Sequence, residues 1–287
     1  MVSRAAYRIL NWPYHLSNSG QPLTCAPALP RSRFFSIRSI SSSAVPIQTL
    51  EPQRLYRQIA EQLRVLIGKG EFAAGTRIPA ERDLAKQLGV SRPSVREALI
   101  ALEVEGWVEI RTGSGVYVLD RSHRTAPPAN GLNGANGSGA EWGPLEIIRA
   151  RRLVEGETAA TAAQHGKRKD VDAMRRAIRT MRELAARNEV PHEGDRAFHL
   201  AIVNACDNVV LTETVQGFWE SRHGPIFARM IDYFETMGSW QAAIGEHEAI
   251  LDAIAARDPG AARDAMHQHM DKFHQRFSAS WRRAKAT

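Results

Sequence analysis

The 287-residue chain has few cysteines and no long apolar run. Two cysteines, Cys25 and Cys206, are too few for a disulfide framework, so the sequence predicts a protein of a reducing compartment, and we expect a cytoplasmic one. No apolar run approaches the roughly 20 residues of a bilayer-spanning helix, so a membrane partner is not expected. The length suits two domains better than one.

Acidic residues are absent from residues 1–50, which hold five arginines and therefore five of the seven net positive charges of the chain. This segment is rich in Ser and Pro and lacks helical periodicity over most of its length. Its composition is similar to that of a transit peptide, but an unstructured N-terminal extension is the favoured interpretation. The overall basicity, with a pI near 9.8, is therefore weak evidence for nucleic-acid binding, and the local placement of arginines matters more.

Residues 51–120 have the pattern of a small DNA-binding domain. Apolar residues at helical spacing predict a first helix that ends near Gly68 and Gly70. The run PAERDLAKQLGVSRPSVRE (79–97) predicts two short helices around a turn at Gly89, with Ser91 as the cap of the second. One short strand at 76–78 and a hairpin around the turn 112–115 complete a winged helix-turn-helix.

The remainder of the chain reads as a linker followed by helices. Residues 121–143 contain PPANGLNGANGSG, the composition of a flexible linker. Residues 144–283 are expected to form six or seven helices without a convincing strand, with segments at 144–165, 168–187, 193–206, 209–234, 240–257 and 259–283. The predicted fold is mostly α: an N-terminal winged helix-turn-helix joined to an all-α helical bundle.

The winged helix offers a surface suited to the DNA major groove. Arg92 and Arg96 lie four residues apart near the start of the recognition helix, and an arginine there is able to bond guanine or a phosphate. Arg82 lies near the start of the preceding helix. The expected contacts are completed by two small polar residues of the recognition helix and by two residues at the hairpin tip: Ser91, Ser94, Thr112 and Gly113.

Helical periodicity places four ligand-type side chains on inward-facing stripes of the bundle. These residues are Asp195, His199, His247 and His269. A single histidine on an apolar face is usually a hydrogen-bonded core residue. Four such residues, two of them spaced i, i+4, favour a metal site instead, and one carboxylate with three imidazoles suits Zn²⁺, Ni²⁺ or a similar divalent ion.

The N-terminal domain resembles the winged helix of the GntR family of bacterial transcription regulators, and residues 54–119 carry the resemblance. The resemblance implies that Arg82, Arg92 and Arg96 contact DNA and that Gly113 lies at the wing tip. Members of this family differ mainly in their C-terminal effector domains.

The bundle resembles the FCD effector domain of the FadR subfamily through RARRLVEGE (149–157), DRAFHLAIVNACDN (195–208) and GEHEAILDAIAARDPGAARDAMHQHM (245–270). The resemblance implies that Asp195, His199, His247 and His269 bind a metal and that a small organic acid completes its coordination. Arg151 is a candidate partner for the acid, although a surface pair with Glu155 explains it equally well. FWESRHGP (218–225) is similar to sugar-acid regulators of this subfamily, while pyruvate- and lactate-type acids stay open.

The function expected from the sequence is that of a homodimeric, ligand-responsive repressor on a near-palindromic operator, and not that of an enzyme. Activation in place of repression stays open. The rival hypothesis is a metal-dependent hydrolase, because three histidines and an aspartate with an open position also describe a hydrolytic site. That site lacks a base, since Glu246 and Glu248 are expected to point away from the metal. A fusion of a GntR domain to an aminotransferase or to a mixed α/β effector domain is disfavoured, because no strands or cofactor lysine motif are visible.

Overall fold

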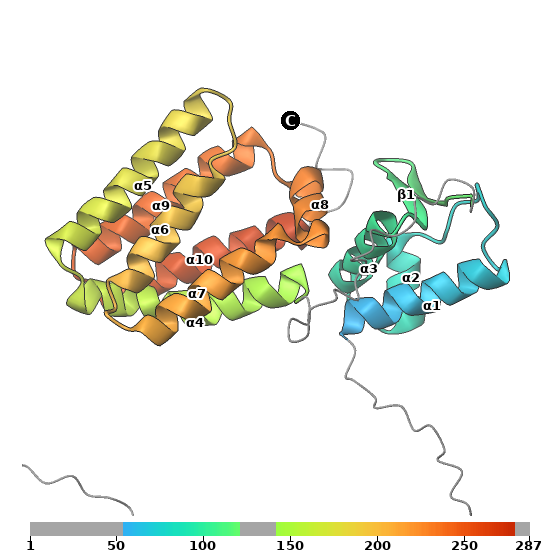
Figure 1. Ribbon diagram of the computed structural model, residues 1–287, viewed down its shortest axis with the longest axis horizontal. Coiled ribbons are helices and arrows are strands. Elements are labelled where there is room, and N and C mark those ends of the chain that lie inside the picture. The colour runs from blue at the N-terminus through green and yellow to red at the C-terminus, as the bar shows by residue number, and fades with distance from the viewer. Residues whose placement is uncertain (1–53, 121–141, 279–287) are drawn as a thin grey trace, which may run out of the picture. The chain divides into compact units, whose positions relative to one another are not determined.

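The computed structural model describes residues 54–120 and 142–278 (Figure 1). The predicted extension at 1–50, the linker except for Trp142 and Gly143, and residues 279–283 lie outside the described residues. The predicted fold class is confirmed: helices dominate, and the one sheet of the described residues has two strands. None of the helices described is long and apolar enough to cross a membrane.

The N-terminal domain is a winged helix in which local sequence sets the ends of the helices. Its elements are α1 (Leu55–Lys69), α2 (Glu81–Leu88), α3 (Arg92–Val104), β1 (Val108–Arg111) and β2 (Gly115–Val118). Gly89 ends α2 with φ of 67°, a backbone conformation that favours glycine. Ser91 caps α3, since its side chain accepts a hydrogen bond from Ser94 N. The helix-turn-helix predicted from these residues is therefore confirmed.

The wing is a two-stranded antiparallel hairpin. Val108 pairs with Val118 and Arg111 with Gly115, and Gly113 at the tip has φ of 81°. The strand expected at 76–78 is reduced to an isolated bridge between Arg77 and Tyr117. The segment still lies beside β2, because Ile78 N donates to Val116 O at 3.0 Å.

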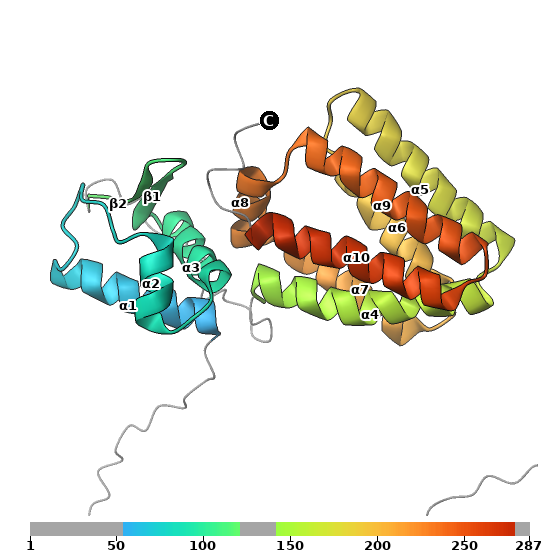
Figure 2. The same cartoon turned by 180° about the vertical axis from the view of Figure 1, so that it is seen from behind.

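The C-terminal domain is an all-helical bundle (Figures 1 and 2). Its elements are α4 (Pro144–His165), α5 (Arg168–Ala186), α6 (His192–Asn204), α7 (Val209–Glu220), the 3₁₀ turn η2 (Ser221–His223), α8 (Pro225–Phe234), α9 (Met237–Ala255) and α10 (Pro259–Ser278). Helix α10 packs along α4 and α9, and α5 packs against α6 and α9. Helix α4 also packs against α6, α7 and α9, so it contacts most of the other long helices of the bundle.

The single segment expected at 209–234 is instead two helices separated by η2, which corrects that prediction. Gly224 adopts an extended backbone with ψ of 146°, and Pro225 starts α8. Proline lacks the N–H that a continuous helix needs and fits the first turn of a new one. The break matters because η2 carries Arg222, which reaches the interior of the bundle.

The interior of the bundle is apolar except for one group of charged and imidazole side chains. Phe198, Met174 and Ile250 are fully buried parts of the apolar core. Seven ionisable side chains are also buried: Arg151, Glu155, Asp195, His199, Arg222, His247 and His269. Buried charges are costly unless they are paired or bind a metal, so this group is the candidate functional site of the domain.

Candidate functional site

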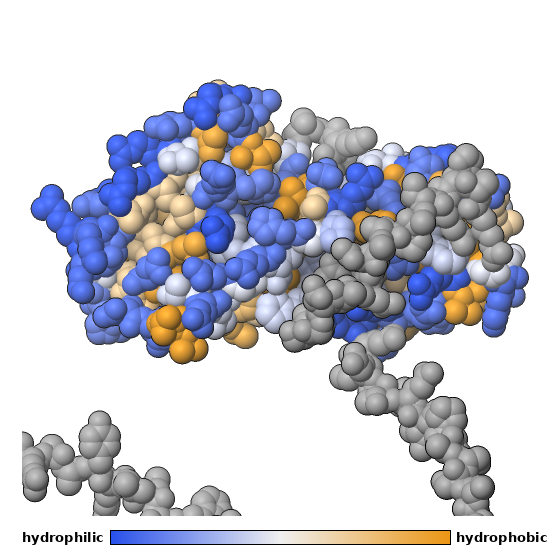
Figure 3. Space-filling model, in the orientation of Figure 1, coloured by the Kyte–Doolittle hydropathy of each residue, from blue (hydrophilic) through white to orange (hydrophobic). Residues whose placement is uncertain are grey.

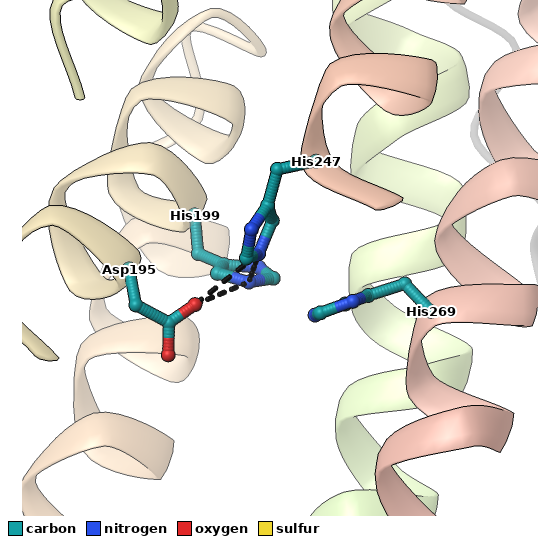
Figure 4. Close-up of side chains that lie close together, drawn as sticks. All are labelled: Asp195, His199, His247 and His269. Carbon is teal, nitrogen blue, oxygen red and sulfur yellow. Dashed lines mark hydrogen bonds and ion pairs between the residues drawn. The ribbon is translucent and has the colours of Figure 1, made fainter. Parts of the chain in front are cut away.

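Four ligand-type side chains converge inside the bundle. Asp195 and His199 come from α6, His247 from α9 and His269 from α10 (Figure 4). All four are buried, and one donor atom from each lies within 4.8 Å of the others. These are the four residues that the sequence analysis selected, so the structure brings the whole predicted set together.

The spacing of the donor atoms fits a divalent metal. His199 Nε2 lies 3.3 Å from His247 Nε2. Asp195 Oδ1 lies 3.4 Å from His199 Nε2 and 3.2 Å from His247 Nε2. Tetrahedral ligands about 2.0–2.1 Å from a zinc ion are separated by roughly 3.3–3.4 Å. Two imidazole nitrogens and a carboxylate oxygen therefore already have the mutual distances of three ligands of one ion.

Two carboxylates contact the Nδ1 atoms of His199 and His269, on the side of each ring that faces away from the cluster. His199 Nδ1 contacts Glu155, and His269 Nδ1 lies 2.8 Å from Glu246 Oε2. A carboxylate that accepts the Nδ1 proton leaves the Nε2 lone pair facing the ion, as in many metalloproteins. Neither glutamate was predicted in this role, since a contact between different helices is not visible in sequence spacing. Glu246 was expected to point away from the metal, which agrees with its contact to His269 Nδ1.

The pKa shifts of three of the four side chains favour the protonation states that bind metals, whereas Glu155 and Asp195 outweigh burial and raise the pKa of His199. Burial opposes charge on Asp195, yet hydrogen bonds with His199 and His247 and the charge of Arg222 hold the pKa of Asp195 well below its usual value. Burial, together with the neighbouring His247 and His199, lowers the pKa of His269 well below its usual value. Burial also lowers the pKa of His247. The result is a carboxylate beside two imidazoles that favour the neutral form, which are the states that metal ions require.

Two buried arginines lie beside the cluster. Arg151 Nε donates to Glu155 Oε1 at 2.5 Å, and Arg222 Nη1 donates to Asp195 Oδ2 at 3.1 Å. The ring of Trp219 stacks against both guanidinium groups, with centroid distances of 4.6 and 4.3 Å. The pair between Arg151 and Glu155 therefore exists, but inside the protein and not on its surface. Arg222 was not predicted, because a residue in a 3₁₀ turn has no helical periodicity to reveal it.

A small cavity of about 20 Å³ opens next to these groups. Its wall includes Arg151, Arg222 and Arg276, together with the candidate ligands Asp195 and His269. Three guanidinium groups attract an anion, and a carboxylate matches the fork of an arginine. The arginines therefore make this wall suited to an anion.

The winged helix holds a second concave region. It lies between the start of α2, the start of α3 and the wing, and Arg82, Arg92 and Gly113 line it as expected. Ser91, Arg92 and Gly113 are exposed, whereas Ser94 and Thr112 are half-buried. Arg77 and Arg111 also line this region and were missed by the sequence analysis, which followed the helices and not the extended segments.

Arg96 does not share this surface. Its side chain is fully buried, bonds Glu81 through two nitrogens at 2.7 and 2.9 Å, and donates to the carbonyl of Phe277 at 2.7 Å. The expectation that Arg96 contacts DNA does not hold in this structure. A spacing of four residues places two side chains on one ridge, but Arg96 lies one turn further into the domain, where Glu81 covers it.

Comparisons with known proteins agree with both domains. The model of the family described as "Bacterial regulatory proteins, gntR family" matches residues 55–118, and that of the FCD domain matches residues 146–272. The "Uxu operon transcriptional regulator" of Escherichia coli is 38% identical over 231 residues, which cover 78% of this chain and 87% of the relative. The "Exu regulon transcriptional regulator" of Escherichia coli is 35% identical over 230 residues, which cover 78% of this chain and 85% of the relative. The "Glc operon transcriptional activator" of Escherichia coli is 30% identical over 219 residues, which cover 74% of this chain and 84% of the relative.

Proposed function

Because this chain belongs to the GntR family of bacterial transcription regulators and carries an FCD domain, we propose that a metal-bound organic acid controls its binding to operator DNA. Regulation of transcription by binding DNA is what the family does, and enzymatic activity is not. The metal, the acid and the direction of control are the parts that we propose.

The observation that carries the proposal is the buried cluster of Asp195, His199, His247 and His269 beside a cavity rich in arginine. A divalent ion such as Zn²⁺ or Ni²⁺ would be held by these four residues and would supply an open coordination position for a carboxylate oxygen. Arg222 and Arg151 would then hold the second oxygen of the acid. Arg222 faces Asp195 at present, so it is already directed at the ligand set.

The DNA-contacting residues that we propose are Arg82, Ser91, Arg92, Ser94, Thr112 and Gly113. Exposed arginines at the starts of α2 and α3 support this assignment, because the N-terminal end of a recognition helix enters the major groove. Gly113 at the tip of the wing has no side chain to keep the backbone away from a phosphate. Arg96 is left out of the set because it is buried.

We further propose that the protein acts as a homodimer in the bacterial cytoplasm and represses transcription until the acid binds. A two-fold axis in the protein matches a near-palindromic operator. The bundle exposes apolar side chains at Leu153, Val209 and Val210, and Figure 3 shows apolar patches on an otherwise mostly hydrophilic face of this domain. An acid changes the affinity for DNA only if its own affinity differs between the arrangement that binds DNA and the arrangement that does not.

The test uses the purified full chain before and after removal of metal by a chelator. We expect about one divalent ion per chain. We also expect an acid from a panel of organic acids to raise the melting temperature of the metal-loaded protein but not that of the metal-free protein. An acid at 100 times its Kd stabilises the folded state by about 2.7 kcal/mol. The same acid should change the affinity for a duplex that the protein itself selects from random sequences.

His247→Ala should abolish metal retention and the effect of acid on DNA binding. His165→Ala is the matched control, since His165 is exposed at the end of α4. Full metal occupancy in His247→Ala, or an effect of acid that survives the chelator, would contradict the proposal.

The alternative of a metal-dependent hydrolase is not supported. A hydrolytic site needs a base beside the open position of the metal. Glu246 faces the outer nitrogen of His269, and Glu248 pairs with Arg182 at 2.5 Å. The relatives are transcription regulators as well.

A further inference from the structure

One arginine on the concave region of the winged helix has no carboxylate partner. Arg77 lines this region between α2, α3 and the wing, as do three other arginines. Each of those three pairs with a carboxylate: Arg82 with Asp83 at 3.5 Å, Arg92 with Glu81 at 3.0 Å and Arg111 with Glu109 at 2.7 Å. Arg77 is exposed and forms no ion pair within residues 54–120 and 142–278. Its positive charge is therefore available to a partner from outside.

The backbone of Arg77 is held beside β2 on both sides. Val118 N donates to Thr76 O at 3.0 Å, and Ile78 N donates to Val116 O at 3.0 Å. Ile78 is 2% exposed and belongs to the core. Neighbouring side chains of an extended segment point to opposite sides, so the side chain of Arg77 points away from the core. These hydrogen bonds fix the place from which the arginine extends.

The side chain of Arg77 lies across Gly115, the first residue of β2. A Cβ atom at position 115 would lie 2.9 Å from Arg77 Cζ and 3.1 Å from Arg77 Cδ. Carbon atoms in ordinary contact are about 3.5–4.0 Å apart, so a larger residue would push the guanidinium aside. Gly115 also has φ of 133°, which disfavours other residues. Glycine at this position therefore leaves the arginine its place beside the wing.

A phosphate group of the DNA backbone is the partner that fits this arginine. The fork of a guanidinium is able to donate two hydrogen bonds to a phosphate. Arg77 lies on the extended segment beside the wing, whereas the start of the recognition helix is the part that enters the major groove. Contacts from such flanking positions fix the protein on the duplex and carry no sequence information directly.

We propose that Arg77 is a further DNA-contacting residue, which bonds a backbone phosphate beside the wing, and that Gly115 positions it by leaving room for its side chain. The inference rests on the proposed DNA surface, because Arg77 shares the concave region with Arg82 and Arg92. It adds to that surface a segment that belongs neither to the recognition helix nor to the tip of the wing.

The experiment measures the Kd of the full chain and of Arg77→Ala by fluorescence anisotropy at several salt concentrations. Two duplexes of equal length are compared, one selected by the protein from random sequences and one of unrelated sequence. Each phosphate contact contributes about 0.9 to the slope of log K against log salt concentration, which is about an eightfold change in affinity per tenfold change in salt. We expect Arg77→Ala to make the slope shallower by about 0.9 and to weaken both duplexes about 5–10-fold at 0.1 M salt. Arg77→Lys keeps the charge and should retain most of the affinity.

The possible outcomes separate this inference from the proposed DNA surface. A loss confined to the selected duplex would overturn the phosphate contact in favour of a base contact. If Arg92→Ala weakens binding and Arg77→Ala does not, this inference alone fails; if neither does, the proposed surface fails as well. Arg168→Ala removes the same charge from α5 and should bind as the wild type does, so an equal loss there would assign the effect to net charge.

Gly115→Ala tests the positioning of the arginine. It should reproduce most of the loss caused by Arg77→Ala, and the two changes together should weaken binding no further than Arg77→Ala alone. Gly70→Ala is the matched control for backbone strain, since Gly70 has φ of 85° but no other group of the described residues within 4 Å of the added Cβ. Both glycine variants should lower the melting temperature, but only Gly115→Ala should weaken DNA binding. Full affinity in Gly115→Ala, or a loss that adds to that of Arg77→Ala, would refute positioning by Gly115.

Discussion

Helices α3 and α6 each carry two polar residues four positions apart, and the structure uses the two pairs differently. On α6, Asp195 and His199 both face the interior and belong to one cluster. On α3, Arg92 is half exposed at 50% of its side-chain area, while Arg96 is fully buried. The same spacing therefore gives one shared site in the bundle and two different environments in the winged helix.

The difference comes from what lies opposite each pair. Residues four apart differ by only about 40° around a helix, so both normally share a face. Other helices of the bundle surround the face of α6 that carries Asp195 and His199. Both arginines pair with Glu81 of α2, but Arg92, the first residue of α3, stays half exposed, whereas Arg96 is buried beneath Glu81. Periodicity predicts a shared face, but only packing decides whether that face is covered at both positions.

The largest expected effect is on Arg96. Arg96→Ala should lower the free energy of unfolding by about 3–5 kcal/mol, because it leaves the buried Glu81 without its main partner. Arg92→Ala should lower it by no more than about 1 kcal/mol, since the pair of Arg92 with Glu81 is made by a half-exposed side chain. Urea unfolding of both variants checks the difference.

The double variant Glu81→Gln with Arg96→Met supplies the control. It removes both charges and should recover part of the lost stability, because no unpaired ion is left inside. Wild-type stability in Arg96→Ala combined with lost DNA binding would show that Arg96 contacts DNA, as the sequence alone suggested.

The exposed member of the pair should act on DNA instead. Arg92→Ala is expected to weaken binding to a selected duplex by about 1–3 kcal/mol while the bundle keeps its metal. If Arg92 contacts a phosphate, the slope of log K against log salt concentration should also become shallower by about one, because one fewer counterion is released. Fluorescence anisotropy at several salt concentrations measures both quantities.

Arg168→Ala is the matched control for this experiment. It removes the same charge from the exposed start of α5, which is not part of the proposed DNA surface. An equal loss of affinity in both variants would point to net charge and not to a contact by Arg92.

The winged helix was predictable because its signals are local. Gly89 in the turn, Ser91 as a cap and the buried stripe of Val95, Leu99 and Leu102 lie within 14 residues. In the bundle, the break before α8 was missed although Gly224 and Pro225 are in the sequence. The apolar residues on either side continued a helical pattern, and this outweighed two residues that disfavour a continuous helix.

The site was predictable only in part, and for a related reason. Each metal-ligand candidate lies on the apolar stripe of its own helix, so periodicity finds it. The relation between helices is not encoded in spacing, so Glu155 was seen beside Arg151 but not behind His199. Arg222 lies in a short turn that has no stripe at all.

Those interhelical contacts give the next prediction. Glu155→Gln and Glu246→Gln should each lower metal affinity about 10–100-fold, because the neutral amide holds the Nδ1 proton of its histidine less strongly. Competition with a chromogenic chelator measures the affinity. Glu157→Gln is the control, since Glu157 lies two residues further on α4 but is exposed.

Glu246→Gln is the more informative of the two variants. Glu155 also pairs with the buried Arg151, so its replacement disturbs a second charge, whereas Lys272 and Arg276 near Glu246 are less buried. Unchanged affinity in Glu246→Gln would show that the metal ligands do not depend on the outer carboxylates.

The smallest expected effect concerns Glu97, which follows Arg96 on α3. Arg96 pairs with the carboxylate of Glu81, whereas the carboxylate of Glu97 accepts a long hydrogen bond from the backbone N–H of Leu145, at 3.4 Å. Burial raises the pKa of Glu97 from 4.5 to about 7, so the folded state favours the protonated acid. The stability that this proton contributes is present below the ordinary pKa and is lost as the pH rises through about 7. Between pH 6 and pH 8 the loss should be about 1 kcal/mol.

Glu97→Gln should remove this dependence, since the amide does not titrate and has a similar shape. Urea unfolding at both pH values compares the variant with the wild type and with Glu213→Gln, which alters an exposed glutamate on α7. A pH dependence that persists in Glu97→Gln would assign it to another group. Its loss would show that α3 buries two adjacent charges by different means, one by pairing with Glu81 and the other by taking up a proton.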